Sequence, residues 1–213
     1  MSFLLINFEE KTMFDLIIKI LFLSYKGGVG KSSLAINLAA EIDADYVTND
    51  LISTSTKAIQ IEPNKRRIPK GLLTLDRVVF DFGAMSTQLD PKAVQATEAA
   101  DVIVIPTLTD IRSLTATIKT VNLVTPMNKP IAIIINNFTK EKKFDEAKAF
   151  LTERLGELPI FAIRATTLFD RVAKDGEEWF RNIHNDNGEW QLNKSRLAHE
   201  EVYNAIIELG IQS

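Results

Sequence analysis

The sequence predicts a single-domain α/β protein with three layers, α/β/α, in which helices cover both faces of a mostly parallel central sheet. The first observation is that short apolar, strand-like runs alternate with segments of helical periodicity, which is typical of this fold class. The second is a glycine-rich loop at 26–33, between the first clear strand and the first helix. A chain of 213 residues without a linker is long enough for one hydrophobic core and too short for two ordinary domains. We therefore expect one domain over 1–213, with residues 1–17 as an N-terminal extension whose role the sequence does not define.

The expected strands are short apolar runs bounded by polar residues, glycine or proline. They lie at 18–23, 46–50, 77–81, 101–106, 131–135 and 159–163. Asp81 ends the third run, Pro106 ends the fourth, and Asn136 and Asn137 follow the fifth, which is the most apolar. Apolar residues at three- and four-residue spacing predict the helices. These are expected at 32–42, 111–121, 144–155 and 197–209.

Composition excludes several kinds of site. The chain has no cysteine, so it has no disulfide framework, thiolate zinc site or iron–sulfur cluster. Its net charge is −3, so nucleic-acid binding would depend on a local basic patch. The apolar stretches before residue 24 are too short to span a bilayer, and no signal-peptide pattern precedes the first strand. We therefore expect a cytoplasmic protein.

The loop at 26–33, Lys-Gly-Gly-Val-Gly-Lys-Ser-Ser, has the composition of a phosphate-binding loop. Glycines let the backbone curl so that successive N–H groups converge on phosphate oxygens, and the following helix directs its positive end at them. We expect Lys31 to bridge the outer phosphates and the Ser32 hydroxyl to join the Mg²⁺ shell. The predicted nucleotide-binding residues of the loop are Gly27, Gly28, Val29, Gly30, Lys31, Ser32 and Ser33. The loop predicts binding of a nucleoside triphosphate; an ordinary glycine turn is the alternative.

A second lysine, Lys26, opens the loop. With it the motif resembles the deviant Walker A motif, Lys-Gly-Gly-x-Gly-Lys-Ser/Thr, of the ParA/MinD family, and a looser resemblance extends to about residue 175. The resemblance implies a P-loop NTPase of the SIMIBI class that uses ATP and Mg²⁺, closest to small ParA-like plasmid partition proteins. It also implies a nucleotide-dependent sandwich homodimer in which Lys26 is catalytic across the interface, much as an arginine finger is. A solvated lysine beside an ordinary loop is the alternative.

Asp81, in Val-Val-Phe-Asp-Phe-Gly, resembles the family's Walker B segment. A carboxylate at the end of a buried strand beside the loop is suited to hold Mg²⁺ through a water molecule, because this ion keeps much of its hydration shell. Gly83 would let the backbone approach the γ-phosphate and move after hydrolysis. An aspartate that caps a turn is the alternative reading of Asp81.

Asp50 is the candidate for positioning the attacking water. The family typically has Asp-x-Asp-Pro here, whereas Thr48 replaces the first carboxylate and Leu51 replaces the proline. We therefore expect slow, partner-stimulated ATP hydrolysis; a plain turn aspartate is the alternative. The resemblance assigns adenine recognition to Asn136, whose amide can donate and accept. Asn137 is equally available as the reader, and a strand-end asparagine in a turn is the alternative.

Three other residues carry weaker signals. Asp110 lies near the region that packs at the family's dimer interface, and a helix N-cap explains it at least as well. His184 and His199 lie in polar C-terminal sequence, where we expect surface residues and not ligands.

Two basic groups are candidates for DNA contact. The C-terminal group is Arg164, Arg171, Lys174 and Arg181, and the loop group is Lys65, Arg66, Arg67 and Lys70. DNA-partitioning members of the family use their C-terminal region, and a dimer doubles the phosphates contacted, which would make binding ATP-dependent. Solvated faces are the alternative for both groups. No membrane partner is expected, because the C-terminal helix carries acids at its polar positions.

The leading interpretation is a ParA-like ATPase whose ATP-bound dimer binds DNA nonspecifically, associates with the nucleoid, and drives partition or positioning of a plasmid or other mobile DNA element. A ParB-like or other partner would stimulate hydrolysis. The first alternative is an ATPase that positions a protein cargo, or a conjugation or secretion complex, without DNA. The second, an ATP-dependent ligase of the dethiobiotin synthetase type, is disfavoured because such enzymes lack the Lys-Gly-Gly opening.

Overall fold

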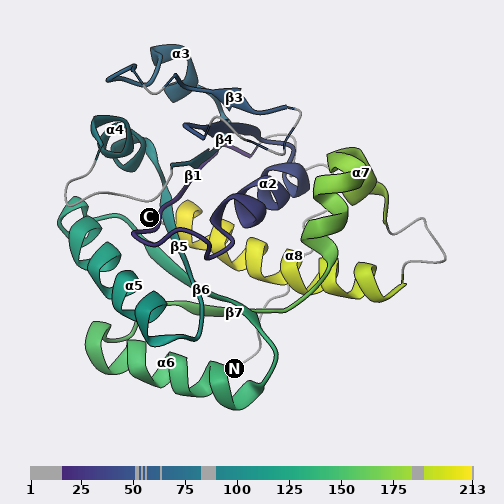
Figure 1. The fold of residues 1–213 in the computed structure, drawn as a ribbon. Helices are drawn as coiled ribbons and strands as arrows, with labels where there is room; N and C mark the ends of the chain where they lie inside the picture. The colour runs from purple at the N-terminus through teal and green to yellow at the C-terminus, as the bar shows by residue number, and fades with distance from the viewer. Residues whose placement is uncertain are drawn as a thin grey trace.

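The computed structural model describes residues 16–50, 53, 55, 57–62, 64–82, 90–183 and 190–212, and its centre is a seven-stranded sheet (Figure 1). Neighbouring strands are parallel, in the order β3-β2-β4-β1-β5-β6-β7. The strands are β1 (Ile18–Phe22), β2 (Asp45–Thr48), β3 (Ile59–Gln60), β4 (Arg77–Asp81), β5 (Val102–Thr107), β6 (Ile131–Phe138) and β7 (Ile160–Arg164). The parallel α/β architecture is confirmed, and β3 is too short to leave a pattern in the sequence.

Helices cover both faces of this sheet (Figure 1). Those that are described are α2 (Lys31–Glu41), α3 (Lys70–Leu73), α4 (Pro91–Ala99), α5 (Ile111–Val124), α6 (Glu141–Leu155), α7 (Leu168–Asn182) and α8 (Trp190–Ile211), with a 3-10 turn η1 (Thr125–Met127). Helices α2, α7 and α8 pack on one face, and α4, α5 and α6 pack on the other. Within the described ranges, no helix has both the length and the apolar character needed to cross a bilayer.

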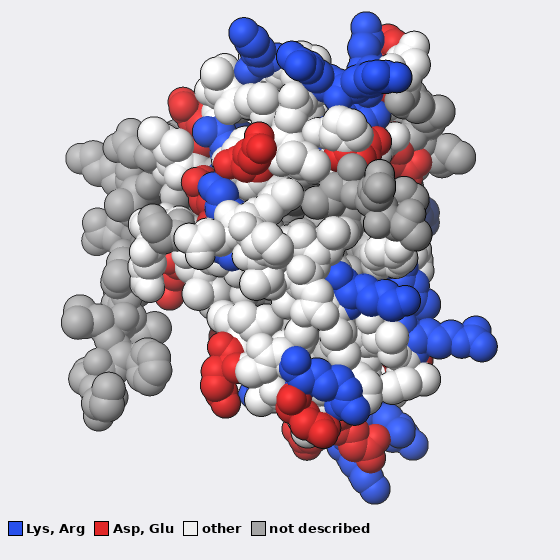
Figure 2. Space-filling view, turned by 90° about the vertical axis from the view of Figure 1, so that its left-hand side faces the viewer, with Lys and Arg blue, Asp and Glu red and all other residues white. Residues whose placement is uncertain are grey.

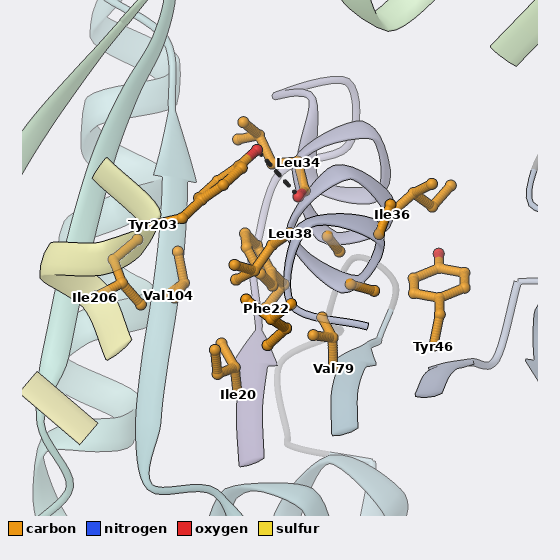
Figure 3. Packing of buried hydrophobic residues seen from close by; sticks show 14 of the residues in the cluster. Ile20, Phe22, Leu34, Ile36, Leu38, Tyr46, Val79, Val104, Tyr203 and Ile206 are labelled. Carbon is orange, nitrogen blue, oxygen red and sulfur yellow. Dashed lines mark hydrogen bonds between the residues drawn. The ribbon is translucent and has the colours of Figure 1, made fainter. Parts of the chain in front are cut away.

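The strands read as continuous apolar runs because both of their faces are buried. In β6, Ile131, Ile133 and Ile135 join the core under α5 and α6, while Ala132 and Ile134 join the core under α2 and α8. Figure 3 shows the second core, where side chains of β1 and β5 meet those of α2 and α8. The parallel arrangement brings the carboxyl ends of β1, β4 and β6 to one edge of the sheet, where the polar residues predicted to act together lie.

The structure corrects the expectation for His199, which is not a surface residue. Its side chain is 3% exposed and stacks on Phe169, with ring centroids 5.3 Å apart, while its ring lies 6.1 Å from that of Tyr203. Helix α8 places His199 and Tyr203 four residues apart on its core-facing side. Burial lowers the pKa of the imidazole to about 4, so it is neutral at physiological pH. His184 lies outside the described residues.

Candidate nucleotide-binding site

The glycine-rich loop joins the end of β1 to the start of α2, as the sequence predicts. Gly28 and Gly30 have φ of 77° and 84°, and Gly30 is the N-cap of α2. Left-handed backbone of this kind is accessible to glycine without the strain that a Cβ introduces. The loop therefore leads into the positive end of an 11-residue helix whose first N–H groups need acceptors from outside the helix. This backbone can hold phosphate oxygens.

Asn136, at the end of β6, contacts this loop directly. Its side-chain Nδ2 donates to the carbonyl oxygen of Val29 at 3.1 Å, across 107 positions of sequence. A Cβ on Gly30 would lie under 3.0 Å from this amide, closer than real Cβ atoms come to a neighbour. Asn136 is 3% exposed, and its Oδ1 has no hydrogen-bond partner among the described residues. Asn137 is exposed and has φ of 56°, so the two asparagines occupy different environments.

Lys31 and Asp81 form an ion pair at the centre of the site. Asp81 ends β4 and is fully buried, and its Oδ2 accepts a hydrogen bond of 2.6 Å from the Tyr46 hydroxyl. Burial lowers the pKa of the Lys31 ammonium to about 8, and the Asp50 carboxylate acts in the opposite direction. The ammonium of Lys31 and the carboxylate of Asp81 therefore lie together, in surroundings where water screens their charges little.

Tyr46 is a site residue that sequence reasoning missed. Strand β2 lies beside β4 with Tyr46 opposite Val79 and Thr48 opposite Asp81, which puts the Tyr46 ring and the carboxylate on the same face of the sheet. Burial raises the pKa of the phenol to about 12, and hydrogen bonding with Thr48, Ser53 and Ser32 acts in the opposite direction. The hydroxyl is thus a donor at neutral pH. In the sequence, Tyr46 is marked only as a polar aromatic residue two positions before Thr48. That position indicates a contact with Asp81 only once β2 and β4 are known to be neighbours.

Asp50 and Thr48 lie at the edge of this group. The Thr48 hydroxyl, fully buried, accepts a 3.0 Å hydrogen bond from the Asp50 backbone N–H, a turn contact that Thr makes in place of the family's first carboxylate. The Asp50 side chain is exposed and acts electrostatically on Lys31 and Tyr46. Both features fit the turn alternative and the water-positioning role.

Lys26 points to a different part of the molecule from Lys31. Its Nζ donates to the Ser113 hydroxyl at 2.9 Å and lies 3.9 Å from Asp110 Oδ2. Asp110 is the N-cap of α5, accepting 3.1 Å hydrogen bonds from the backbone N–H groups of Arg112 and Ser113, so the capping interpretation is confirmed. Hydrogen bonding from Ser113 holds the pKa of Asp110 below its ordinary value, and Lys26 contributes.

The residues present fit a nucleotide-bound Mg²⁺ better than a metal held by protein alone. The described residues contain no group of three or more acidic or histidine side chains able to hold an ion. Mg²⁺ commonly binds one or two protein oxygens together with phosphates and water. Ser32, on the first turn of α2, and Asp81, beside the loop, supply such oxygens. Gly83 lies outside the described residues.

The two basic groups differ in how far nearby carboxylates neutralise them. In the C-terminal group, Arg164 forms an ion pair with Glu141, and Arg171 pairs with Asp175 at 2.6 Å. Lys174 is exposed, and the Arg181 side chain lies outside the described residues. In the loop group, all four cations are exposed, and Figure 2 shows basic side chains gathered over the β3 and α3 end of the molecule.

Comparisons with known proteins agree with this geometry. The family described as "CobQ/CobB/MinD/ParA nucleotide binding domain" matches residues 20–179, well over half of the chain. No curated protein matches. Among solved structures, the ATP complex of a variant of Cyanothece McdA is 15% identical with a TM-score of 0.57, over 90% of this chain and 98% of the other.

Two further structures extend this likeness. MinD from Pyrococcus horikoshii with Mg-ADP is 15% identical with a TM-score of 0.55, over 87% of this chain and 95% of the other. A Borrelia burgdorferi putative plasmid partition protein bound to AMPPNP is 18% identical with a TM-score of 0.53, over 79% of this chain and 97% of the other. The chain therefore belongs to the CobQ/CobB/MinD/ParA nucleotide-binding family and is an ATPase of the ParA/MinD type.

Proposed function

We propose that this protein hydrolyses ATP as a nucleotide-dependent homodimer that binds duplex DNA nonspecifically and positions or partitions a plasmid or other mobile DNA element. The observation that carries the proposal is the divergence of the two loop lysines. Lys31 meets Asp81 inside its own subunit, whereas Lys26 extends to the N-terminus of α5. A lysine whose ammonium is held away from Lys31 and Asp81 would be available to the phosphates of a second subunit, and this supports the proposal.

Within one subunit, the loop amides and Lys31 would hold the phosphates, and Ser32 and Asp81 would hold the magnesium ion. When bound, the ion neutralises charge that develops on the phosphate oxygens during transfer. Lys31 must leave Asp81 to reach a phosphate, and the Tyr46 hydroxyl, 2.6 Å from the other carboxylate oxygen, keeps Asp81 oriented while it does so. Asp50 would orient the attacking water.

Asn136 supports a preference for adenine. Its Nδ2 is used by Val29, so the Oδ1 acceptor is the part of the amide left to meet a ligand. Adenine carries an exocyclic amino donor where guanine carries a carbonyl acceptor. An acceptor that approaches this position attracts the first base and repels the second.

Across the dimer, Lys26 would exchange its contacts with Ser113 and Asp110 for the partner's phosphates. The Asp110 contact is 3.9 Å long and half exposed, and exposed ion pairs of this kind stabilise proteins by only about 0–1 kcal/mol. Phosphate oxygens that carry more charge can therefore compete for the ammonium. Dimerisation would also bring two copies of each basic group to one assembly, and affinity for DNA rises steeply with the number of phosphates contacted.

The test is binding to nonspecific duplex DNA with ATP, with ADP and without nucleotide. We expect binding with ATP alone, its loss in Lys26→Ala, and its retention in Lys148→Ala, an exposed lysine on α6. Charge reversal at Arg66 and Arg67 should weaken binding and flatten its salt dependence if the loop group contacts DNA. The same change at Arg171 and Lys174 tests the C-terminal group.

A protein cargo is the second candidate, and one observation favours it. Arg164 and Arg171, half of the C-terminal basic group, are ion-paired with Glu141 and Asp175, and the chain as a whole is acidic, with a net charge of −3. ATP-driven dimerisation without DNA binding in any nucleotide state would refute the DNA proposal and support this one.

A further inference from the structure

The connection from β3 to β4 carries the loop group, and it begins at the edge of the sheet where the nucleotide site lies. Strand β3 runs parallel to β2, and β2 to β4, so β3 ends at the same edge of the sheet as Thr48 and Asp81. The Ile61 backbone N–H continues the pairing of β3 with β2 by donating to the Thr48 carbonyl at 2.8 Å. The basic segment is therefore joined to the strand that leads into Asp50.

Two buried isoleucines fix this segment to the body of the protein. Ile61 and Ile68 are each 3% exposed and belong to the core under α4, α5 and α6. The Ile68 backbone N–H also donates to Gln95 Oε1 on α4 at 2.8 Å. Between them, the Lys65 backbone N–H donates to the Glu62 carbonyl at 3.1 Å and closes a turn. Because the backbone is ordered before a partner arrives, binding costs less conformational entropy.

The loop group presents four exposed cations within six residues of sequence. Within the part of the chain that the structure describes, none of the four forms an ion pair, whereas Arg164 and Arg171 of the C-terminal group do. Residues 61–73 contain one acid, Glu62, so four cations and one acid give this stretch a net charge of +3. Figure 2 shows basic side chains gathered at this end of the molecule. Positive charge is thus concentrated here in a chain whose net charge is −3.

We propose that the loop group is the surface that contacts the phosphates of duplex DNA. This inference rests on the proposed function, and it assigns DNA contact to the β3–β4 connection in place of the C-terminal group. The guanidinium groups of Arg66 and Arg67 can each donate two parallel hydrogen bonds to one phosphate. Lys65 and Lys70 add compact charges on either side of them in the sequence. Contacts of this kind carry no base preference, so binding would be nonspecific.

The segment lacks the features that other classes of partner require. Its apolar side chains serve the core: Ile61 and Ile68 are buried, and Leu72 and Leu73 pack against the same cluster. No aromatic residue occurs in 61–73. Single-stranded nucleic acid is bound largely by stacking on aromatic rings, protein interfaces are depleted of lysine and use apolar or aromatic anchors, and membrane binding gains from buried apolar area. The phosphates of a duplex need cations alone.

The salt dependence of DNA binding counts the phosphates that the protein contacts. Each contact changes the slope of log K against log salt concentration by about −0.9. If the four cations of both subunits contact one duplex, about eight contacts give a slope of about −7. Replacing Arg66 and Arg67 by alanine removes half of these contacts, and the slope should become about −3.6.

The test measures this slope for the full chain and a nonspecific duplex, with ATP, with ADP and without nucleotide. Arg66→Ala/Arg67→Ala is compared with Arg66→Lys/Arg67→Lys, which keeps the charge. The matched control is Lys142→Ala/Lys148→Ala, which removes two exposed cations from α6. ATP-driven dimerisation, measured for every variant, checks the fold.

With ATP, we expect a slope of about −7 for the wild type and for the α6 control, and about −3.6 for the alanine variant of the loop group. The affinity of that alanine variant at about 0.1 M salt should be at least about a hundredfold lower than that of the wild type. The lysine variant should keep the wild-type slope, because slope depends on charge and not on the shape of the side chain.

Wild-type binding by the alanine variant of the loop group would overturn the assignment and leave the DNA function standing. Loss of binding in Arg171→Ala/Lys174→Ala alone would do the same. A wild type that binds no duplex in any nucleotide state would instead refute the proposed function itself. In that case, binding to phosphatidylserine vesicles that the alanine variant loses would show that the loop group recognises a membrane, which also overturns the proposal.

Discussion

Replacing Gly30 with alanine tests the contact between the phosphate loop and β6. The substitution forces a Cβ into a left-handed residue and against the Asn136 amide. Gly28 is a matched control, because its φ of 77° is similar and a Cβ there would meet nothing within 4 Å. Both substitutions also restrict the unfolded chain by the same amount, so that this effect cancels in the comparison.

The expected costs differ by the contact alone. A residue with a side chain in left-handed backbone costs about 1–2 kcal/mol, and Gly28→Ala should lower the free energy of unfolding by this amount alone. Gly30→Ala must also displace the Asn136 amide from the Val29 carbonyl, leaving buried polar groups without partners, which adds about 1–3 kcal/mol. In an Asn136→Ala background the obstacle is gone, and Gly30→Ala should cost about as much as Gly28→Ala.

The assay is urea unfolding of the two single alanine variants, of Asn136→Ala, and of the Gly30→Ala/Asn136→Ala double variant, without nucleotide. We expect a coupling free energy of about 1–3 kcal/mol between positions 30 and 136 and unchanged m-values. Equal losses for Gly28→Ala and Gly30→Ala, or additivity in the double variant, would refute the reasoning that Asn136 braces the loop.

Three other predictions concern buried ionisable groups. Tyr46→Phe removes the 2.6 Å hydrogen bond to the buried carboxylate of Asp81 and should lower the free energy of unfolding by about 1.5–3 kcal/mol. The control is Tyr203→Phe, which removes a 3.4 Å hydrogen bond to a backbone carbonyl and should lower the free energy of unfolding by less. Equal losses of stability would contradict a charge-assisted bond between Tyr46 and Asp81. Burial lowers the pKa of Lys31 to about 8, so at pH 9 most of the free protein has lost the ammonium charge that binds phosphate. The affinity for ATP should therefore fall about tenfold from pH 7 to pH 9, and binding at pH 9 should take up a proton. Calorimetry in two buffers measures both effects, and Lys31→Arg should show neither. For the core imidazole of His199, the pKa is lowered from 6.5 to about 4, so the unfolded state binds more protons between these values. Through this group, the free energy of unfolding of the wild type should therefore fall by about 2 kcal/mol from pH 7 to pH 5. Urea unfolding measures this, and a His199→Phe variant whose stability falls with pH as steeply as that of the wild type would contradict the prediction.

The parts of the site that could be predicted from sequence are those set by local geometry. Glycines at fixed spacing after a strand and before a helix specify the loop whatever surrounds it, and Asp81 is marked by its place at the end of an apolar run. Six of the seven described strands could also be predicted, because strands buried on both faces contain few polar residues, whereas the two-residue β3 is too short to show such a pattern.

What sequence could not supply is which strand ends become neighbours. Tyr46 meets Asp81 only because β2 and β4 are adjacent although they are separated along the chain. Asn136 donates a hydrogen bond to the Val29 carbonyl, from which it is separated by 107 positions in the sequence. His199 was wrongly placed on the surface because the polar composition of α8 conceals which of its residues face the core.

The most direct test of cooperation between subunits is the ATPase activity of mixed dimers. Lys26→Ala chains and Asp50→Ala chains are each inactive if both residues are required, one across the interface and one within the subunit. Mixed one to one, about half of the dimers combine both chains, and each mixed dimer contains one complete site, so that about a quarter of the wild-type activity should return. Recovery of that size would establish that Lys26 acts on its partner's nucleotide. No recovery in mixtures that still dimerise with ATP would contradict the account.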